Sequence, residues 1–192
     1  RYLLKPMNNF IELIDTIRNS RDIKRRITVE DNIEEIRSMQ TVFNSMLDSI
    51  ENQFYNDSLT GLKNRYALLE EIDQHSEAFL MILNIDRFEE LNNLYGNKIG
   101  DRVLKELTSL LLELLPQGAK IYRLHADEFA YLDVGAMDLE EFEGLASFLI
   151  ETISSEKFAI DEHNDISISI TAGIAYGAGL LLPQADIALK IA

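Results

Sequence analysis

The sequence predicts two successive folds: a helical segment with coiled-coil spacing, and then an α+β domain in which helices pack over a sheet. Apolar residues before position 57 recur at alternating steps of three and four residues, whereas short apolar runs and amphipathic helices alternate after it. Charge divides at the same place. Residues 1–56 carry 8 basic and 9 acidic residues, a net of −1, and residues 57–192 carry 10 and 24, a net of −14.

The composition excludes several classes of function. The chain has 192 residues, of which 46% are hydrophobic, and this is enough for a packed core. Its formal charge of −15 excludes nucleic acid as an electrostatically driven partner. It has no cysteine, which excludes disulfides and thiolate metal sites. The three histidines, His75, His125 and His163, stand too far apart for the ligand spacing of a zinc site.

The longest uncharged run, residues 166–185, is long enough to span a membrane, but its composition argues against a helix. Polar and apolar residues alternate in it with the period of a strand, and glycines and a proline follow. We therefore expect no membrane span within the chain. The sequence starts at Arg1 rather than at a methionine, and a helical pattern over 185–192 ends without a cap. We interpret it as a fragment of a longer protein.

The apolar residues of the N-terminal segment form two groups with coiled-coil spacing. Their stripes are too narrow for helices buried on all sides and predict a seam against partner helices. A basic, irregular stretch over residues 19–29 separates the two groups. The alternative is an ordinary amphipathic pair that packs on the rest of the same chain. The groups are Met7, Phe10, Ile14 and Ile17, and then Ile36, Met39, Phe43, Met46 and Ile50.

This segment resembles a HAMP domain. Pro6 opens a first helix, a connector follows, and the stretch 31–36 leads into Phe43-Asn44-Ser45-Met46. The usual Asp-Glu-Ile-Gly at the start of the second helix is Asp-Asn-Ile-Glu in this chain. The resemblance implies that residues 1–53 are a dimeric four-helix relay. It therefore implies a homodimer on the cytoplasmic side of the inner membrane, with a transmembrane segment before Arg1.

The elements expected after residue 57 begin with a helix and a strand. The helix follows Asn64 and has an apolar face made of Tyr66, Leu69 and Ile72. The strand covers residues 79–85, Phe-Leu-Met-Ile-Leu-Asn-Ile, a run suited to burial on both faces.

Acidic residues mark the expected starts of the next helices. Asp86 is expected as an N-cap, with Glu89 three residues later as in a capping box, and Asp138 with Glu141 repeats the pattern. A further helix is expected over 101–115, before Pro116. The apolar face of the helix after Asp138 comprises Phe142, Leu145, Phe148 and Leu149.

The remaining elements are strands. Residues 120–124 and 129–134 predict two strands of a tight hairpin, and residues 166–172 predict the last strand. Together these elements predict an α+β domain with helices over one face of a sheet.

Five motifs, in order along the chain, resemble those of the GGDEF family, whose members make cyclic di-GMP from two molecules of GTP. The resemblance implies a GGDEF domain over residues 54–192, with a nucleotidyl-cyclase-like sheet and a ferredoxin-like core. The last helix stops before the family's usual lysine. The motifs are Asp57-Ser-Leu-Thr-Gly-Leu-Lys-Asn-Arg65, the segment from Asn84-Ile-Asp86 to Gly100-Asp101, Arg123-Leu-His-Ala-Asp-Glu-Phe129, Ser169-Ile-Thr-Ala-Gly-Ile174, and Ala185-Asp186-Ile-Ala188-Leu189.

The family's reaction implies a metal site. A ribose 3′-hydroxyl attacks the α-phosphate of a second GTP, and carboxylates hold the Mg²⁺ ions that neutralise the charge. Asn84 stands where one of these carboxylates is expected, and an amide lacks the charge. Asp127 retains the other, and Glu128 and Phe129 complete the signature. Asp86 is not an added ligand, because active relatives also have an acid there.

Three further changes affect the phosphate side. His125 and Ala126 replace two glycines that would adopt positive φ and admit the phosphates. Glu89 replaces a lysine near the phosphates. We therefore expect weakened Mg²⁺ binding and assign no catalytic residue. The family's product-inhibition motif, Arg-x-x-Asp, would fall at Pro116 and Ala119 and is absent.

The residues that recognise guanine in the family are retained as Asn92 and Asp101. An Asn and an Asp match the acceptor and donor edge of guanine. Alternatively, Asp101 is a helix N-cap and Asn92 a turn residue. We expect a structural role for Arg123 in the hairpin and no catalytic role for His125.

The sequence thus predicts a non-catalytic GGDEF module that transmits a conformational change or senses GTP. It would relay a signal from the HAMP segment to a downstream domain of the EAL type. Two alternatives stay open. One is an active diguanylate cyclase that tolerates Asn84 by using Asp86 and Asp127 with Mn²⁺. The other is a dimerisation spacer that binds no nucleotide.

Overall fold

The computed structural model describes residues 11–12, 14–16, 23–28, 34–161 and 164–192. The chain divides into two compact units, Arg1–Tyr55 and Asn56–Ala192. Several residues of the sequence predictions lie outside the described ones: Pro6, Met7, Phe10, Ile17, the stretch 31–33 and His163.

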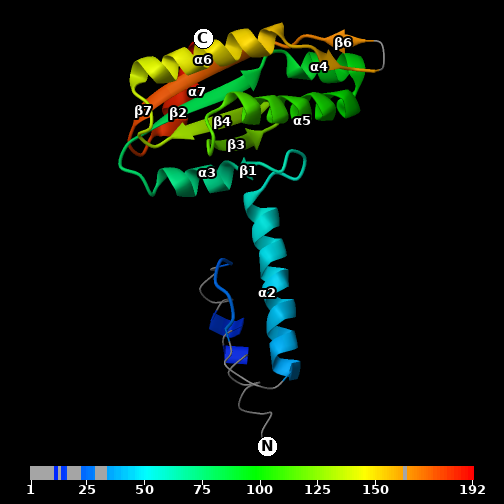
Figure 1. The fold of residues 1–192 in the computed structure, drawn as a ribbon, viewed down its shortest axis with the longest axis vertical. Coiled ribbons are helices and arrows are strands. Elements are labelled where there is room, and N and C mark those ends of the chain that lie inside the picture. The colour runs from blue at the N-terminus through cyan, green and yellow to red at the C-terminus, as the bar shows by residue number, and fades with distance from the viewer. Residues whose placement is uncertain (1–10, 13, 17–22, 29–33, 162–163) are drawn as a thin grey trace, which may run out of the picture. The chain divides into compact units, whose positions relative to one another are not determined.

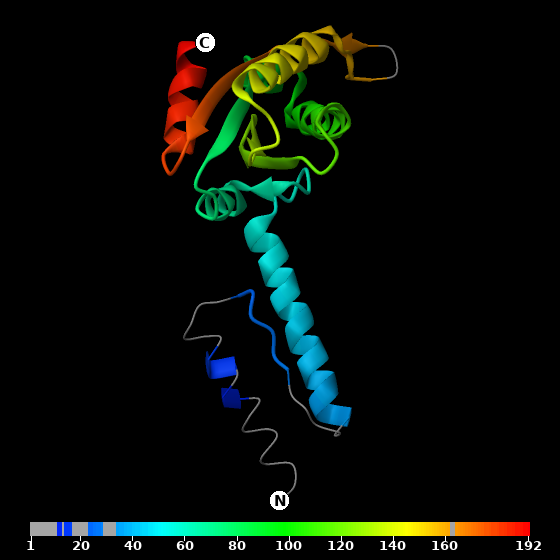
Figure 2. The same ribbon diagram turned by 60° about the vertical axis from the view of Figure 1, so that its left-hand side comes forward.

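The first unit contains the long helix α2 (Glu34–Tyr55) and the segment 23–28 beside it (Figures 1 and 2). The apolar residues of the expected seam differ in their exposure. Ile36 is buried and Phe43 packs against a small cluster formed by Ile27 and Leu47. The other members of the seam, Met39, Met46 and Ile50, are 40–50% exposed.

No helix in the described part of the chain combines the length and the apolar character needed to cross a membrane.

The second unit is built on a five-stranded sheet of order β1-β3-β4-β2-β7 (Figure 1). The short β1 pairs with β3 in parallel, and all the other neighbours are antiparallel. β5 and β6 form a separate two-stranded hairpin. The strands are β1 (Lys63–Asn64), β2 (Ala78–Ile85), β3 (Lys120–His125), β4 (Glu128–Asp133), β5 (Phe158–Ala159), β6 (Asp165–Ile166) and β7 (Ile170–Gly177).

The prediction of one continuous strand over 166–172 is wrong. β6 ends at Ile166, residues 167–169 have no strand pairing, and β7 continues to Gly177. The alternating apolar residues of this stretch therefore belong to two sheets, and periodicity alone does not show where a strand changes its partner.

Helices cover both faces of the sheet, which corrects the prediction of one covered face (Figure 2). Along β2, Met81 and Leu83 point into one apolar core and Leu80 and Ile82 into the other. A strand buried on both faces needs a cover on each. The first core takes in α4 (Phe88–Tyr95), α5 (Asn97–Leu114) and α6 (Leu139–Ser155), and the second takes in α3 (Arg65–Ile72) and α7 (Leu181–Ile191).

Two helix starts are confirmed. The side chain of Asn64 accepts hydrogen bonds from the first backbone amides of α3. Asp138 and Glu141 form the expected capping box at the start of α6, with bonds of 2.9 and 3.0 Å.

Two other helix starts are wrong. α4 follows Arg87, which provides no side-chain cap, so Asp86 and Glu89 do not form a capping box. α5 begins at Asn97 after Gly96, so Asp101 lies a full turn inside the helix and is not its N-cap. The expectation that an acidic residue caps the helix failed for α5 because Gly96 alone joins α4 to α5, which leaves no room for a separate capping residue.

The buried faces of α3 and α6 also differ from the predicted ones. Tyr66 and Leu69 of α3 are exposed, and Leu68 is buried instead. Phe148 of α6 is exposed, whereas Ala146 is buried. The other predicted members agree, because Ile72 of α3 and Phe142 and Leu149 of α6 are buried.

The loop that opens the second unit is tied to β3 by an ion pair. Asp57 accepts hydrogen bonds from the amide and hydroxyl of Thr60, at 2.8 and 2.6 Å, and from Nη1 of Arg123 at 2.8 Å. Burial alone would raise the pKa of Asp57, but these hydrogen bonds outweigh it and hold the pKa below its ordinary value of 3.8. Arg123 itself is buried, so the pair fixes the base of the β3–β4 hairpin.

The helix α7 lies directly on β7 at Gly173. A Cβ at this position would stand 2.4 Å from the carbonyl oxygen of Ala185 and 2.4 Å from the amide nitrogen of Leu189. Only glycine permits this approach, because both contacts are to backbone atoms that cannot rotate away.

We predict that Gly173→Ala destabilises the second unit by about 2 kcal/mol, because α7 must move off the sheet. Gly144→Ala is the matched control. Gly144 lies in α6, and a Cβ added there would have no atom within 4 Å, so this change should stabilise by about 0.5–1 kcal/mol. Chemical denaturation measures both, and equal effects of the two changes would contradict the close contact.

We predict that Asp57→Asn lowers the free energy of unfolding by about 2 kcal/mol at pH 7, because Arg123 then keeps its charge without its partner. The pKa of Asp57 is lower in the folded than in the unfolded chain. Its contribution is therefore complete above about pH 4 and is lost as the pH falls through the folded value.

Denaturation midpoints of the wild type and Asp57→Asn should therefore converge below about pH 4. Glu113→Gln, which removes an exposed carboxylate of α5, serves as the charge-matched control. A constant difference between wild type and Asp57→Asn from about pH 7 to about pH 3 would show that the carboxylate charge contributes nothing.

Candidate functional site

The structure brings the predicted metal-side residues together at one end of the sheet. Asn84, near the end of β2, pairs with Glu128 of β4 on one side and with Thr171 of β7 on the other. The next amide, that of Ile85, donates to the carbonyl of Asp127 at 3.3 Å. The signature hairpin and the end of β2 therefore form one continuous edge.

The turn of the hairpin is strained. Its central residues are Ala126 and Asp127, and Ala126 has a φ of 42°, in the left-handed region that alanine resists. His125 is the last residue of β3, so only one of the two replaced glycines occupies a position of positive φ. Nη2 of Arg123 donates to the carbonyl of Ala126 at 2.6 Å, and this charged hydrogen bond offsets the strain.

The carboxylate of Glu128 has a partner on the hairpin itself. Nε2 of His125 lies 3.2 Å from Oε2 of Glu128, and the histidine side chain is largely exposed.

Asp86 is fully engaged. The hydroxyl of Ser169 donates to its Oδ2 at 2.6 Å, and the hydroxyl of Thr171 donates to its Oδ1 at 2.7 Å. These bonds join the turn after β2 to the start of β7. Each oxygen of Asp86 thus accepts one short hydrogen bond, and the two bonds fix the carboxylate toward the start of β7.

The charge of these residues decides how they would hold a divalent cation. Mg²⁺ prefers anionic oxygens and is usually held by one or two carboxylates together with substrate phosphates. Asn84 contributes a neutral amide, Asp86 is engaged with hydroxyls, and Glu128 is paired with His125. Asp127 is the one signature carboxylate for which the structure gives no such competing partner.

The turn between β2 and α4 is the second strained point of this edge. Arg87 has a φ of 56°, and it and Ala126 are the two non-glycine residues with positive φ in the described part of the chain. Such strain gathers at functional sites. Glu89 and Glu90 occupy the first turn of α4, where a helix favours anionic ligands, and their charges oppose the approach of a phosphate.

The predicted guanine-binding residues lie on two adjoining helices. Asn92 is on α4, and its side-chain oxygen Oδ1 is buried without a hydrogen-bond partner. A Cβ at Gly100 of α5 would stand 2.0 Å from this atom, so the glycine makes room for the asparagine. Asp101, next along α5, is exposed. Its position inside the helix removes the N-cap explanation and leaves its side chain available to a ligand.

The predicted absence of the product-inhibition motif can be placed in the structure. Pro116 and Ala119 form a tight turn before β3, in which the Ala119 amide donates to the Pro116 carbonyl at 2.9 Å. Neither residue offers a charged side chain.

A cavity beside the hairpin, lined in part by Glu128, was not expected from the sequence. Its volume is about 420 Å³, and it lies among α3, α7 and the ends of β3 and β4. Arg65 and Lys190 supply positive charge, and Glu128 and Asp186 supply negative charge. The signal was present in the motifs that contain Arg65 and Asp186, but no spacing rule joins residues so far apart in the chain. The remaining lining residues are Leu124, His125 and Leu189.

The second unit matches a known family. The family model "Diguanylate cyclase, GGDEF domain" matches residues 54–192. The chain is 29% identical over 195 residues to diguanylate cyclase DgcN of Escherichia coli, an alignment that covers 91% of this chain and 47% of DgcN. It is 27% identical over 220 residues to diguanylate cyclase TpbB of Pseudomonas aeruginosa, covering 100% of this chain and 50% of TpbB. The chain thus spans about half the length of these relatives.

Solved structures show the same fold. The isolated GGDEF domain of TpbB from Pseudomonas aeruginosa has a TM-score of 0.66 and 26% identity, over 71% of this chain and 87% of that one. The coiled coil and GGDEF domain of DgcB from Caulobacter crescentus, solved with c-di-GMP, has a TM-score of 0.73 and 20% identity, over 81% and 89%. The second of these shows likeness of fold alone. On the family match, the order of the motifs and the shared fold, this chain belongs to the GGDEF family of diguanylate cyclase domains.

Proposed function

We propose that this chain is a non-catalytic GGDEF regulatory module in cyclic di-GMP signalling, which recognises guanine and no longer joins two molecules of GTP. One observation carries the proposal. Asn84 supplies a neutral amide at the end of β2, where a metal carboxylate is expected, and the hydroxyls of Ser169 and Thr171 already hold the carboxylate of Asp86 two residues further on. Phosphoryl transfer depends on metal ions that neutralise the developing charge, and a site without that charge is ineffective.

The phosphate side gives further support. Glu89 and Glu90 place negative charge at the first turn of α4, and His125 and Ala126 add side-chain atoms where the family has glycines. Each change alone is tolerable. Together they act on the metal, the triphosphate and the turn at once, and these are the parts that catalysis requires.

The guanine side supports nucleotide sensing. The side-chain oxygen of Asn92 has no hydrogen-bond partner, and a turn of this side chain would bring the acceptor to a guanine N–H. Asp101 adds a carboxylate that can accept from the same edge of the base. The fold therefore retains a reason to bind GTP even where the reaction has been lost.

The N-terminal unit is proposed as a HAMP-type relay over residues 1–53, ahead of the GGDEF domain over 54–192. Its support is the exposed apolar face of α2, where a groove of about 320 Å³ is lined by Ser38, Met39, Val42, Phe43 and Met46. A second copy of the helix would cover such a face in a homodimer. As part of this role we propose a transmembrane segment before Arg1, a location at the inner membrane, and an EAL-type domain after Ala192.

We predict that the dimer makes no cyclic di-GMP from GTP with Mg²⁺ or Mn²⁺, as measured by chromatography. Asn84→Asp alone should remain silent, because Glu89 and the His125-Ala126 turn still obstruct the phosphates. In the variant that combines Asn84→Asp with glycines at 125 and 126, restored synthesis would mean that these positions alone block the reaction. Continued absence of product would mean that other parts of the site have also changed. Metal-dependent product from the unmodified chain, abolished by Asp127→Ala, would identify it as an active cyclase instead.

We predict that GTP with Mg²⁺ binds with a micromolar dissociation constant, about −8 kcal/mol. Asn92→Ala should weaken binding at least tenfold, because it removes the buried acceptor. Isothermal titration calorimetry measures both. Asn93→Ala, which alters an exposed neighbour on the same helix, is the control and should bind as the wild type does. No heat with either protein would favour the dimerisation spacer.

A further inference from the structure

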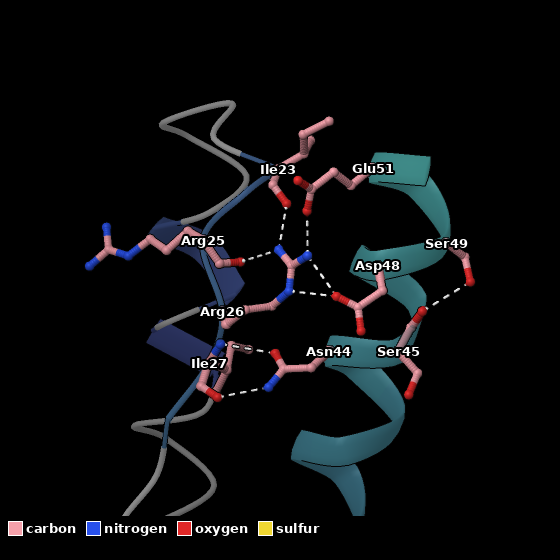
Figure 3. A network of polar contacts seen from close by, with 9 residues as sticks. All are labelled: Ile23, Arg25, Arg26, Ile27, Asn44, Ser45, Asp48, Ser49 and Glu51. Carbon is pink, nitrogen blue, oxygen red and sulfur yellow. Dashed lines mark hydrogen bonds and ion pairs between the residues drawn. The ribbon is translucent and has the colours of Figure 1, made fainter. Parts of the chain in front are cut away.

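The segment 23–28 lies alongside α2 without forming a strand, and mainly side chains hold it there (Figure 3). Asn44 of α2 pairs with the backbone of Ile27 in both directions. The Ile27 amide donates to Oδ1 of Asn44 at 2.9 Å, and Nδ2 of Asn44 donates to the Ile27 carbonyl at 2.9 Å. A side-chain amide thus takes the place of a neighbouring strand and fixes which residue of the segment faces α2.

Arg26 makes the second attachment (Figure 3). Its Nε donates to Oδ1 of Asp48 at 2.8 Å, and its Nη2 reaches both Asp48, at 2.6 Å, and Glu51. Nη1 donates to the carbonyl of Ile23 at 2.9 Å, so the same guanidinium also shapes the segment itself. One cation therefore joins two carboxylates of α2 to the backbone of the segment.

A third attachment lies toward the end of α2. The ammonium of Lys24 stands 4.6 Å from the centroid of the Tyr55 ring, a cation–π distance. Tyr55 is the last residue of α2 and of the first unit. The contacts at Asn44, Asp48 and Tyr55 thus follow α2 from its middle to its C-terminus, while the segment runs in the opposite direction.

The attachments differ in their resistance to salt. Ile27 and Leu47 are almost completely buried against each other, at 1% and 4% exposure, and their contact does not weaken in salt. The side chains of Arg26, Asp48 and Glu51 are 30%, 58% and 31% exposed, so dissolved ions screen their attraction. The strength of the whole attachment should therefore depend on ionic strength.

We propose that residues 23–28 form a releasable strap on α2: Arg26 is its electrostatic latch, and Asn44 sets the register in which it closes. Release uncovers Ile27 and Leu47 and frees the end of α2 at Tyr55, while α2 itself stays helical. This inference does not depend on nucleotide binding or on the family's chemistry. It assigns a conformational switch to contacts within the first unit.

The test is hydrogen–deuterium exchange on the full chain, followed at the Ile27 amide and at amides in the middle of α2. In the wild type, raising NaCl from about 0.05 to about 1 M should accelerate exchange at Ile27 severalfold, with little change in α2. Arg26→Gln should accelerate it about tenfold at low salt and remove the salt dependence. Arg25→Gln, which removes the same charge from an exposed neighbour, is the matched control and should behave as the wild type.

Asn44→Asp provides a second variant. It keeps an acceptor for the Ile27 amide but loses the donor to the Ile27 carbonyl, so exchange at Ile27 should rise even with Arg26 intact. Equal effects of Arg26→Gln and Arg25→Gln would overturn the latch. Loss of protection in α2 together with Ile27 would also overturn the proposal, because the strap would then be part of the helix's own folding unit.

Discussion

The two hydroxyl bonds to Asp86 set the character of the functional edge. They join the turn after β2 to the start of β7, and so they stabilise the central strand at the point where it delivers Asn84 to the edge of the sheet. The same bonds engage both oxygens of Asp86, two residues after Asn84. The contact that stabilises the sheet therefore also fixes the orientation of an acid close to Asn84.

The rest of the edge has a phosphate side and a base side, and the two differ in their backbone strain and in their buried polar groups. On the phosphate side, strained backbone persists at Arg87 and Ala126, although neither residue is a glycine. Such strain costs free energy of the order of 1 kcal/mol each, and Arg123 offsets part of it through its bond to the Ala126 carbonyl. On the base side, Gly100 still leaves space for Asn92, whose oxygen remains buried and unsatisfied.

Much of this could be predicted from the sequence. Three features depend on residues close together in the sequence and were predicted correctly. They are the burial of β2 on both faces, the helix starts after Asn64 and at Asp138, and the order of the family motifs. The prediction that alanine is strained in the signature turn is confirmed at Ala126, although His125 belongs to the strand. The metal-side and base-side residues are identified by resemblance alone, and their roles stay predictions.

The wrong predictions concern residues whose contacts depend on tertiary packing or on partners far away in the sequence. Asp86 has the sequence appearance of an N-cap, but its hydrogen bonds go to residues more than 80 positions away. Asp101 failed as a cap because one glycine joins α4 to α5. Each error reflects a tertiary contact that periodicity does not contain.

The central claim is that the base half of the site works and the metal and phosphate half does not. The most direct test compares the affinities of guanosine and of GTP with Mg²⁺ for the wild-type chain. If the base carries the binding, the two dissociation constants agree within about tenfold, a difference of about 1.4 kcal/mol. If GTP with Mg²⁺ binds a hundredfold or more tightly than guanosine, the phosphate and metal contacts are intact and the account is contradicted.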